Sequence, residues 1–169
     1  MKSNYLFLAS KPAQKIPFSK KLNQFIKVWF ETHKDTFILT DVDTFDSNDI
    51  VGTFEMNKQI YKETGKIYVW KGESKNTIFG KEKINHYFRA WHDYIHINYN
   101  LGYCITEESI VCNIQKDQLP QNWYFEKELI NAEIIDQAHY FYANNSFVKN
   151  QRLFTANYLN NSINALKKQ

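Results

Sequence analysis

Two histidines and a glutamate are spaced as the ligands of one metal ion would be. His92 and His96 lie four residues apart in the sequence His-Asp-Tyr-Ile-His, and Glu108 follows after eleven intervening residues. On a helix this spacing puts both imidazoles one turn apart on the same face, as in the H-E-x-x-H zinc helix. An open zinc site needs about three protein ligands. Glu108, expected in the first turn of the next helix, is the best candidate for the third.

Asp93 lies beside the two histidines and has three possible roles. It can be a further metal ligand, a partner that orients a ligand, or a base. Its short side chain is a poor replacement for the glutamate base of metallopeptidases. Glu107 and Cys104 are alternative ligands, although a single cysteine near a helix end more often serves packing. The ligand types predict a divalent metal, zinc first, with manganese or iron as alternatives.

The helix expected over residues 83–98 has a polar face that does not resemble a solvated one. Between Ile84 and Tyr99 this lysine-rich chain has neither Lys nor Glu. Instead the face carries groups that bind metals, protons and anions. Its members are Asn85, His86, Arg89, His92, Asp93, His96 and Asn100. We therefore predict that His86 takes part in catalysis and that Arg89 binds an anionic group of the substrate.

Three further side chains are candidates for the same pocket. Glu133 and Gln137 lie one turn apart on a helix expected over residues 123–143, as a base and a substrate-binding amide. An exposed polar ridge is the equally open alternative for this pair. Gln115 lies two turns after Glu108 on the same helix face, which predicts a substrate-binding position for it as well.

The remaining pattern predicts a mainly α fold with minor β. Helices are expected over residues 18–32, 83–98, 106–117, 123–143 and 147–166, with Thr106 as an N-cap, and a pair of short strands over 37–40 and 67–70. The acidic stretch 41–49 fails as a calcium loop, because Asp46 and Gly52 occupy the positions that require Gly and an acid. It instead predicts a turn and an Asx-capped helix. We expect one helical metal-binding domain over residues 1–169.

Composition excludes several classes of protein. The chain has 169 residues, 43% of them hydrophobic, and a net charge of +3 from scattered basic residues. This predicts a globular protein without a nucleic-acid surface. No segment has the length of a membrane span or of a signal-peptide core. The sequence therefore predicts a cytoplasmic protein with reduced cysteines and a small-molecule ligand, and it leaves the oligomeric state open.

The ligand pattern resembles a known motif. H-D-x-x-H, eleven residues and E, met at His92, Asp93, His96 and Glu108, is similar to the zinc-ligand motif of the fourth coenzyme-Q biosynthesis protein family, which is helical. The resemblance covers residues 92–108 and implies a metal at those four side chains, but no substrate. The string FRAWHD at residues 88–93 also resembles uncharacterised phage-encoded proteins.

Three functions remain open from the sequence. The first is a metal-dependent enzyme, a hydrolase or lyase, acting on a small molecule that Arg89 suggests is anionic. The second is an HD-type nucleotide phosphohydrolase, whose ligand order is met by His33, His92-Asp93 and Asp136. The third is a non-catalytic protein, either one in which the ion joins two helices or a phage-type ligand-binding protein.

Overall fold

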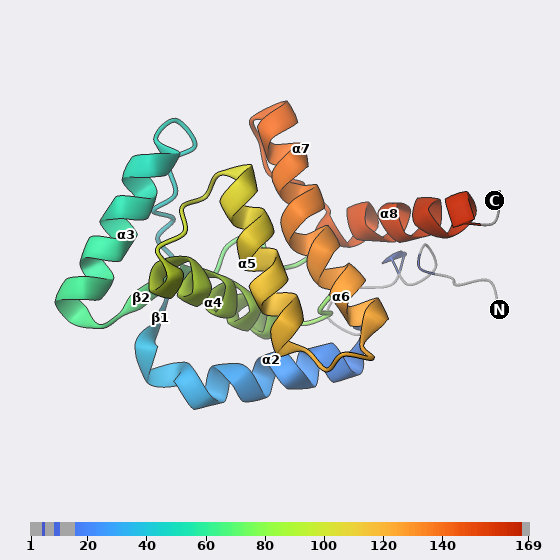
Figure 1. Cartoon of the computed structure of the whole chain (residues 1–169), viewed down its shortest axis with the longest axis horizontal. Coiled ribbons are helices and arrows are strands. Elements are labelled where there is room, and N and C mark those ends of the chain that lie inside the picture. Colours follow the sequence, from blue (N-terminus) through green and yellow to red (C-terminus); the bar gives the residue numbers. More distant parts are fainter. Residues whose placement is uncertain (1–4, 6–8, 11–15, 167–169) are drawn as a thin grey trace.

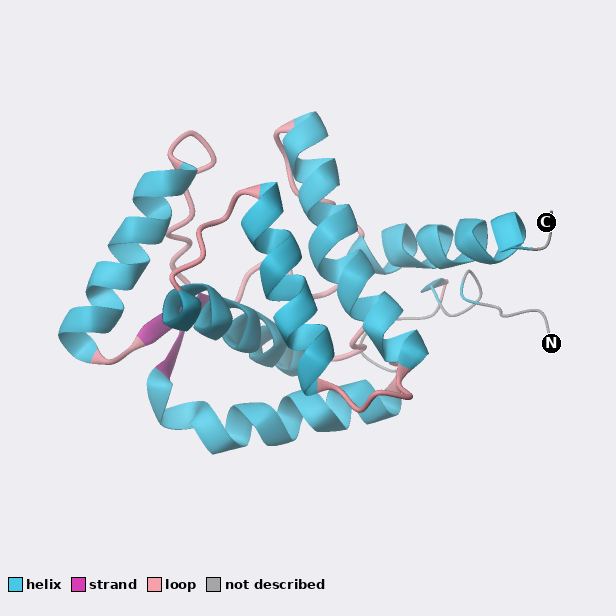
Figure 2. Cartoon of the chain, viewed as in Figure 1, coloured by secondary structure: helices cyan, strands magenta, loops and turns pink. Residues whose placement is uncertain are grey.

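The computed structural model describes residues 5, 9–10 and 16–166, and over these it is mainly helical with one pair of short strands (Figure 2). The predicted fold class is confirmed. The helices are α2 (Lys20–His33), α3 (Ile50–Thr64), α4 (Glu82–Tyr99), α5 (Ile105–Gln118), α6 (Tyr124–Asn131), α7 (Gln137–Asn144) and α8 (Gln151–Leu166). A 3-10 turn covers Lys34–Thr36, a π-helical segment covers Ala132–Asp136, and the strands are β1 (Phe37–Thr40) and β2 (Ile67–Trp70).

The two strands form a parallel pair joined by α3. Phe37 lies opposite Ile67 and Thr40 opposite Trp70. A parallel pair needs a crossover connection, which α3 provides. Asp49 begins this helix by accepting a hydrogen bond from the Gly52 backbone N–H at 2.9 Å. The Asx-capped helix expected after the acidic stretch is therefore confirmed.

Helix α4 lies at the centre of the molecule, between α2 and α5 (Figure 1). Its apolar side packs through aromatic rings, with Tyr87 stacked on Phe30 at 3.7 Å between ring centroids. Trp91 is fully buried and lies 5.4 Å from the Phe25 ring. Because Asn85 and His96 on the polar side are also buried, this side is not a solvated face. The core therefore fixes α4 on both sides.

The expected helix over residues 123–143 is interrupted. Helix α6 passes through the π-helical segment before α7 continues, and such segments are frequent at functional sites. Two predicted helix starts are wrong. Cys104, not Thr106, is the N-cap residue of α5, and α8 begins at Gln151 rather than Phe147. Asn145 is left-handed at φ 48°, and the chain after it packs Phe147 on Phe141 before it becomes helical.

Two other expectations concern membranes and thiols. In the described part of the chain, no helix combines the length and apolar character needed to cross a bilayer. Cys104 is exposed and Cys112 is buried, and both are free thiols.

Candidate metal centre

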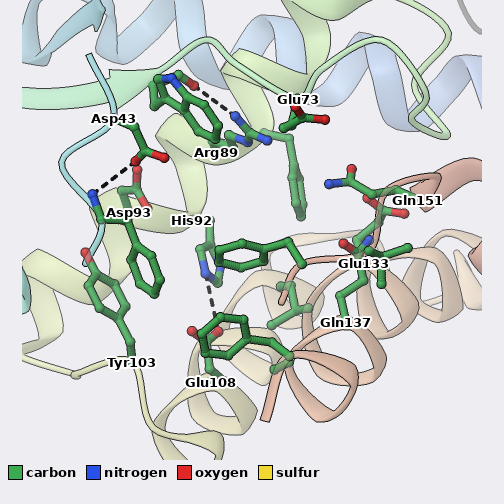
Figure 3. A pocket seen from close by; sticks show the side chains of 18 of the residues that line it. Asp43, Glu73, Arg89, His92, Asp93, Tyr103, Glu108, Glu133, Gln137 and Gln151 are labelled. Carbon is green, nitrogen blue, oxygen red and sulfur yellow. Dashed lines mark hydrogen bonds and ion pairs between the residues drawn. The ribbon is translucent and has the colours of Figure 1, made fainter. Parts of the chain in front are cut away.

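Three side chains from α4 and α5 converge on one point. Nε2 of His92 lies 2.9 Å from Nε2 of His96. Glu108 approaches both rings, with Oε2 at 3.3 Å from His92 Nε2 and Oε1 at 3.5 Å from His96 Nε2 (Figure 3). These are the only three His, Cys, Asp or Glu residues of the described chain that form a group able to hold a metal ion. We call them the metal group.

The turn between α4 and α5 presents these side chains to each other. Asn100 ends α4 in a left-handed conformation at φ 53°, which reverses the chain, and the Leu101 N–H then bonds back to the His96 carbonyl. This Asn cap is the common way to end a helix without glycine. Helices α4 and α5 thus form a hairpin, and it brings Glu108, which lies in the first turn of α5 as expected, alongside α4.

Both imidazoles are oriented from behind by hydrogen bonds at Nδ1. His96 Nδ1 lies 2.9 Å from the Leu101 carbonyl oxygen, and His92 Nδ1 lies 3.0 Å from Gln115 Oε1. Because each Nδ1–H donates to an oxygen, each neutral ring carries its lone pair on Nε2. Such support on the far nitrogen is typical of metal-bound histidines. The protein therefore turns both lone pairs toward the same point.

Two lone pairs 2.9 Å apart require a cation between them. A proton can serve, and the charges around it favour this. Although burial opposes the charged form, the Glu108 carboxylate raises the pKa of His92 to about 9. The histidines in turn hold the pKa of Glu108 at about 2 against the desolvation of that side chain. The group thus stabilises a positive charge at its centre, which a divalent ion can also supply.

The spacing of the ligand atoms suits zinc. Nitrogen and oxygen ligands at ~2.1 Å from a tetrahedral ion lie roughly 3.4 Å from each other. The three distances of 2.9, 3.3 and 3.5 Å lie close to this value. The side chain of His96 is fully buried, and those of His92 and Glu108 are 19% and 13% exposed. Exposure of only two ligands is consistent with an ion that is open on one side.

Asp93 does not join the metal group. Asp93 follows His92 directly, and each residue of a helix is rotated by about 100° from the one before it. The Asp93 carboxylate therefore does not lie on the helix face that the two histidines share. It lies beside Asp43 on the far side of His92 (Figure 3). Burial raises its pKa, while His92 is the strongest of the charges that lower it. The role of Asp93 as a metal ligand is therefore not supported, and a role in the cavity remains.

A cavity of about 590 Å³ opens at the metal group. His92 and Glu108 line it, together with four predicted site residues outside the group, Arg89, Asp93, Glu133 and Gln137. Glu133 comes from the π-helical segment and Gln137 from the start of α7, and both lie across the pocket from His92 (Figure 3). The structure thus brings both into the pocket and does not leave them on an exposed ridge.

The carboxyl of Glu133 is buried in the cavity and has a strongly raised pKa. It is 8% exposed, and Oε1 accepts a hydrogen bond from Thr155 Oγ1 at 2.9 Å. Desolvation raises its pKa to about 7, even though the Thr155 hydroxyl and the neighbouring Gln137 favour the charged form. Near neutral pH this carboxyl therefore exists in both protonation states.

Arg89 lines the cavity, and Nη1 of its guanidinium is already hydrogen-bonded within the protein. Nη1 donates to the backbone carbonyls of Trp70 at 3.0 Å and Gly72 at 2.6 Å, and the group stacks over the Trp70 ring. The four carboxylates whose charges act on it are Asp93, Asp43, Glu133 and Glu73. Arg89 therefore balances acids and holds the strand end, which weakens the expectation that it binds an anionic substrate group.

Two predicted site residues support the site from outside the cavity. His86 is buried and does not line the cavity, because its Nε2 donates to the Lys71 carbonyl at 3.0 Å. We assign it to holding the loop after β2 and correct its predicted catalytic role. Gln115 is fully buried and orients His92, so its predicted contact with substrate is corrected too.

Several cavity residues were not identified from the sequence, and three of them bring polar groups to its lining. Asp43 comes from the loop after β1, Glu73 from the loop after β2, and Tyr103 from the α4–α5 turn. Tyr103 packs edge-on against the His96 ring at 4.8 Å. Glu73 adopts a left-handed backbone at φ 49°, which is uncommon outside glycine and often marks a functional loop. The acidic stretch 41–49 was the only sequence signal for any of them.

The ligand set of an HD-type phosphohydrolase is not assembled. His33 stacks on Trp29 at 4.1 Å between ring centroids, with its Nδ1 at 2.7 Å from the Trp29 carbonyl. Neither His33 nor Asp136 lines the cavity, and neither belongs to the metal group. The alternative ligand Cys104 donates instead to Glu107 Oε2 at 3.0 Å.

Comparisons of the chain with protein-family models, with curated proteins and with solved structures found no match. The resemblance at residues 92–108 is therefore limited to the motif, and a function has to be inferred from the geometry of the site.

Proposed function

We propose that the protein is a metal-dependent enzyme, either a hydrolase or a lyase. It binds one divalent ion at His92, His96 and Glu108, and zinc is the favoured ion. The observation that carries this proposal is the pair of imidazoles turned by Gln115 and Leu101 toward a common point beside a cavity. Catalytic zinc sites combine three protein ligands with an open position. Three ligands and an adjoining cavity of about 590 Å³ support that arrangement.

The residues around the ion have separate roles in this proposal. When bound, a divalent ion lowers the pKa of a water molecule or polarises a substrate oxygen. Glu133 holds or releases a proton on the opposite side of the cavity, because a pKa near 7 suits general acid–base chemistry at neutral pH. The positive charge of Arg89 offsets the negative charges of the carboxylates in the cavity.

A cobalt-substituted protein tests whether the ion has an open position. We expect the protein to bind one Co²⁺ with a visible absorption spectrum, and azide to change that spectrum saturably by occupying the open position. His92→Ala should abolish cobalt binding. His139→Ala is the matched control, because His139 is exposed and outside the metal group.

Two results would contradict this function. A protein that binds no cobalt, zinc, manganese or iron has no metal centre. A cobalt spectrum that azide does not change, together with loss of helical signal on chelation, indicates a closed ion that joins α4 and α5 and contributes to folding. The non-catalytic alternative would then replace the enzyme.

A further inference from the structure

The far side of the cavity carries an amide whose donors are not fully used. Gln137 is 9% exposed and lines the cavity, and its buried Nε2 has no partner of good hydrogen-bond geometry among the described residues beyond its electrostatic contact with the Glu133 carboxyl. Buried donors in native proteins are nearly always paired, and an exception calls for an explanation. A bound molecule with an acceptor at this position supplies one. Figure 3 shows Gln137 on the same side of the pocket as Glu133.

The carboxyl of Glu133 lies next to this amide, and the two side chains together form a polar edge of the cavity. Glu133 lies one turn before Gln137, and the Thr155 hydroxyl donates to its Oε1 while the Gln137 amide lies beside the same carboxyl. With burial raising the pKa of Glu133 to about 7, the carboxyl can donate as well as accept at neutral pH. A side-chain amide next to such a carboxyl offers adjacent donors and acceptors. Heterocyclic bases have such an edge, and Gln pairs with adenine through N6 and N7 in this manner.

The walls of the cavity are aromatic. The eight rings that line it are Phe45, Tyr68, Trp70, Phe88, Tyr103, Phe141, Tyr142 and Phe147. Phe141 lies one turn after Gln137, and it packs against Phe147 at 4.7 Å and Phe45 at 5.8 Å between centroids. Aromatic side chains bind flat rings by stacking. A volume of about 590 Å³ falls within the range of small-molecule sites.

The charge of the cavity favours an uncharged molecule. Its acidic lining residues are Asp43, Glu73, Asp93, Glu108 and Glu133, and its basic ones are Arg89 and Lys149. The lining thus has five acidic side chains and only two basic ones. No net positive charge remains to attract a phosphate.

We propose that the cavity binds an uncharged nucleobase or nucleoside, with its ring between the aromatic walls and its amide-type edge on Gln137 and Glu133. This inference rests on the proposed metal-dependent function, since it places the substrate between that edge and the metal group. It replaces the anionic substrate suggested by Arg89.

Calorimetric titration of the zinc-loaded protein tests this. The probes are adenosine, guanosine, cytidine and uridine, each compared with its 5′-monophosphate. We expect at least one nucleoside to bind with a Kd below about 1 mM, and its monophosphate to bind at least tenfold more weakly. Two variants test the amide: Gln137→Leu removes it, and Gln137→Glu keeps its size but replaces Nε2 by oxygen. Each variant should weaken nucleoside binding at least tenfold and leave the zinc content unchanged.

Gln59→Leu is the matched control, because Gln59 is exposed on α3, and it should leave binding unchanged. Absence of binding by all four nucleosides, tighter binding of the monophosphates, or unchanged binding in both folded Gln137 variants would overturn the inference. Zinc content is measured separately. A protein that contains no zinc contradicts the proposed function. A zinc-loaded protein that binds none of the nucleosides contradicts only this inference.

Discussion

Replacement of Glu108 by alanine is expected to weaken zinc binding by more than about 100-fold. Loss of a residue that merely orients a ligand costs roughly 10- to 100-fold in metal affinity, and loss of a direct ligand should cost more. Gln115→Leu, which removes the acceptor behind His92, should therefore fall between this variant and the unchanged protein. Competition with a chromophoric chelator measures all three affinities.

Glu107→Ala is the control for that series. Glu107 is the adjacent acid, and it is held away from the metal group by the Cys104 thiol at 3.0 Å. Its replacement should leave zinc affinity within about twofold of the unchanged protein, since it touches no ligand. Equal losses in Glu107→Ala and Glu108→Ala, or retained affinity in Glu108→Ala, would show that the third ligand is wrongly assigned.

Glu133→Gln is expected to make the protein more stable at pH 8 by roughly 3 kcal/mol, with no such gain at pH 4.5. The ordinary carboxyl pKa of 4.5 is raised to about 7 in the folded chain. The stabilisation from this proton is complete below pH 4.5 and is lost as the pH rises through 7, where a buried charge must form. The amide keeps an oxygen for the Thr155 hydroxyl but has no charge.

Urea unfolding of both proteins at a series of pH values measures this difference. The metal group titrates equally in both, so its contribution cancels when the free energies of unfolding are subtracted. Glu128→Gln removes an exposed carboxyl from α6 and serves as the control for loss of charge alone. A difference between Glu133→Gln and the unchanged protein that does not vary with pH would contradict the raised pKa.

The local part of the site was predictable, and the part that depends on distant segments was not. His92, His96 and Glu108 follow from helix period and a hairpin turn, which short stretches of sequence encode. Asp43 and Glu73 enter the cavity because β1 and β2 pair in parallel after a crossover, and no periodicity reveals that pairing. The fold class was predictable for the same reason as the ligands.

The errors have related physical causes. A helical wheel places His86 and Arg89 on the polar face of α4, but it does not show that backbone carbonyls of the loop after β2 accept their hydrogen bonds. Gln115 was correctly placed on the face of Glu108, yet it meets His92 rather than the cavity. The sequence pattern over residues 123–143 predicted one continuous helix, and not the π-helical segment that carries Glu133.

Anomalous scattering at the zinc edge from a crystal of the zinc-loaded protein shows whether His92, His96 and Glu108 hold the ion. We expect one peak at ~2.0–2.1 Å from Nε2 of His92 and of His96 and ~2.0–2.2 Å from a carboxylate oxygen of Glu108, with its fourth position facing the cavity. A zinc peak away from these atoms, a fourth protein ligand that closes the ion, or no peak at all would contradict it.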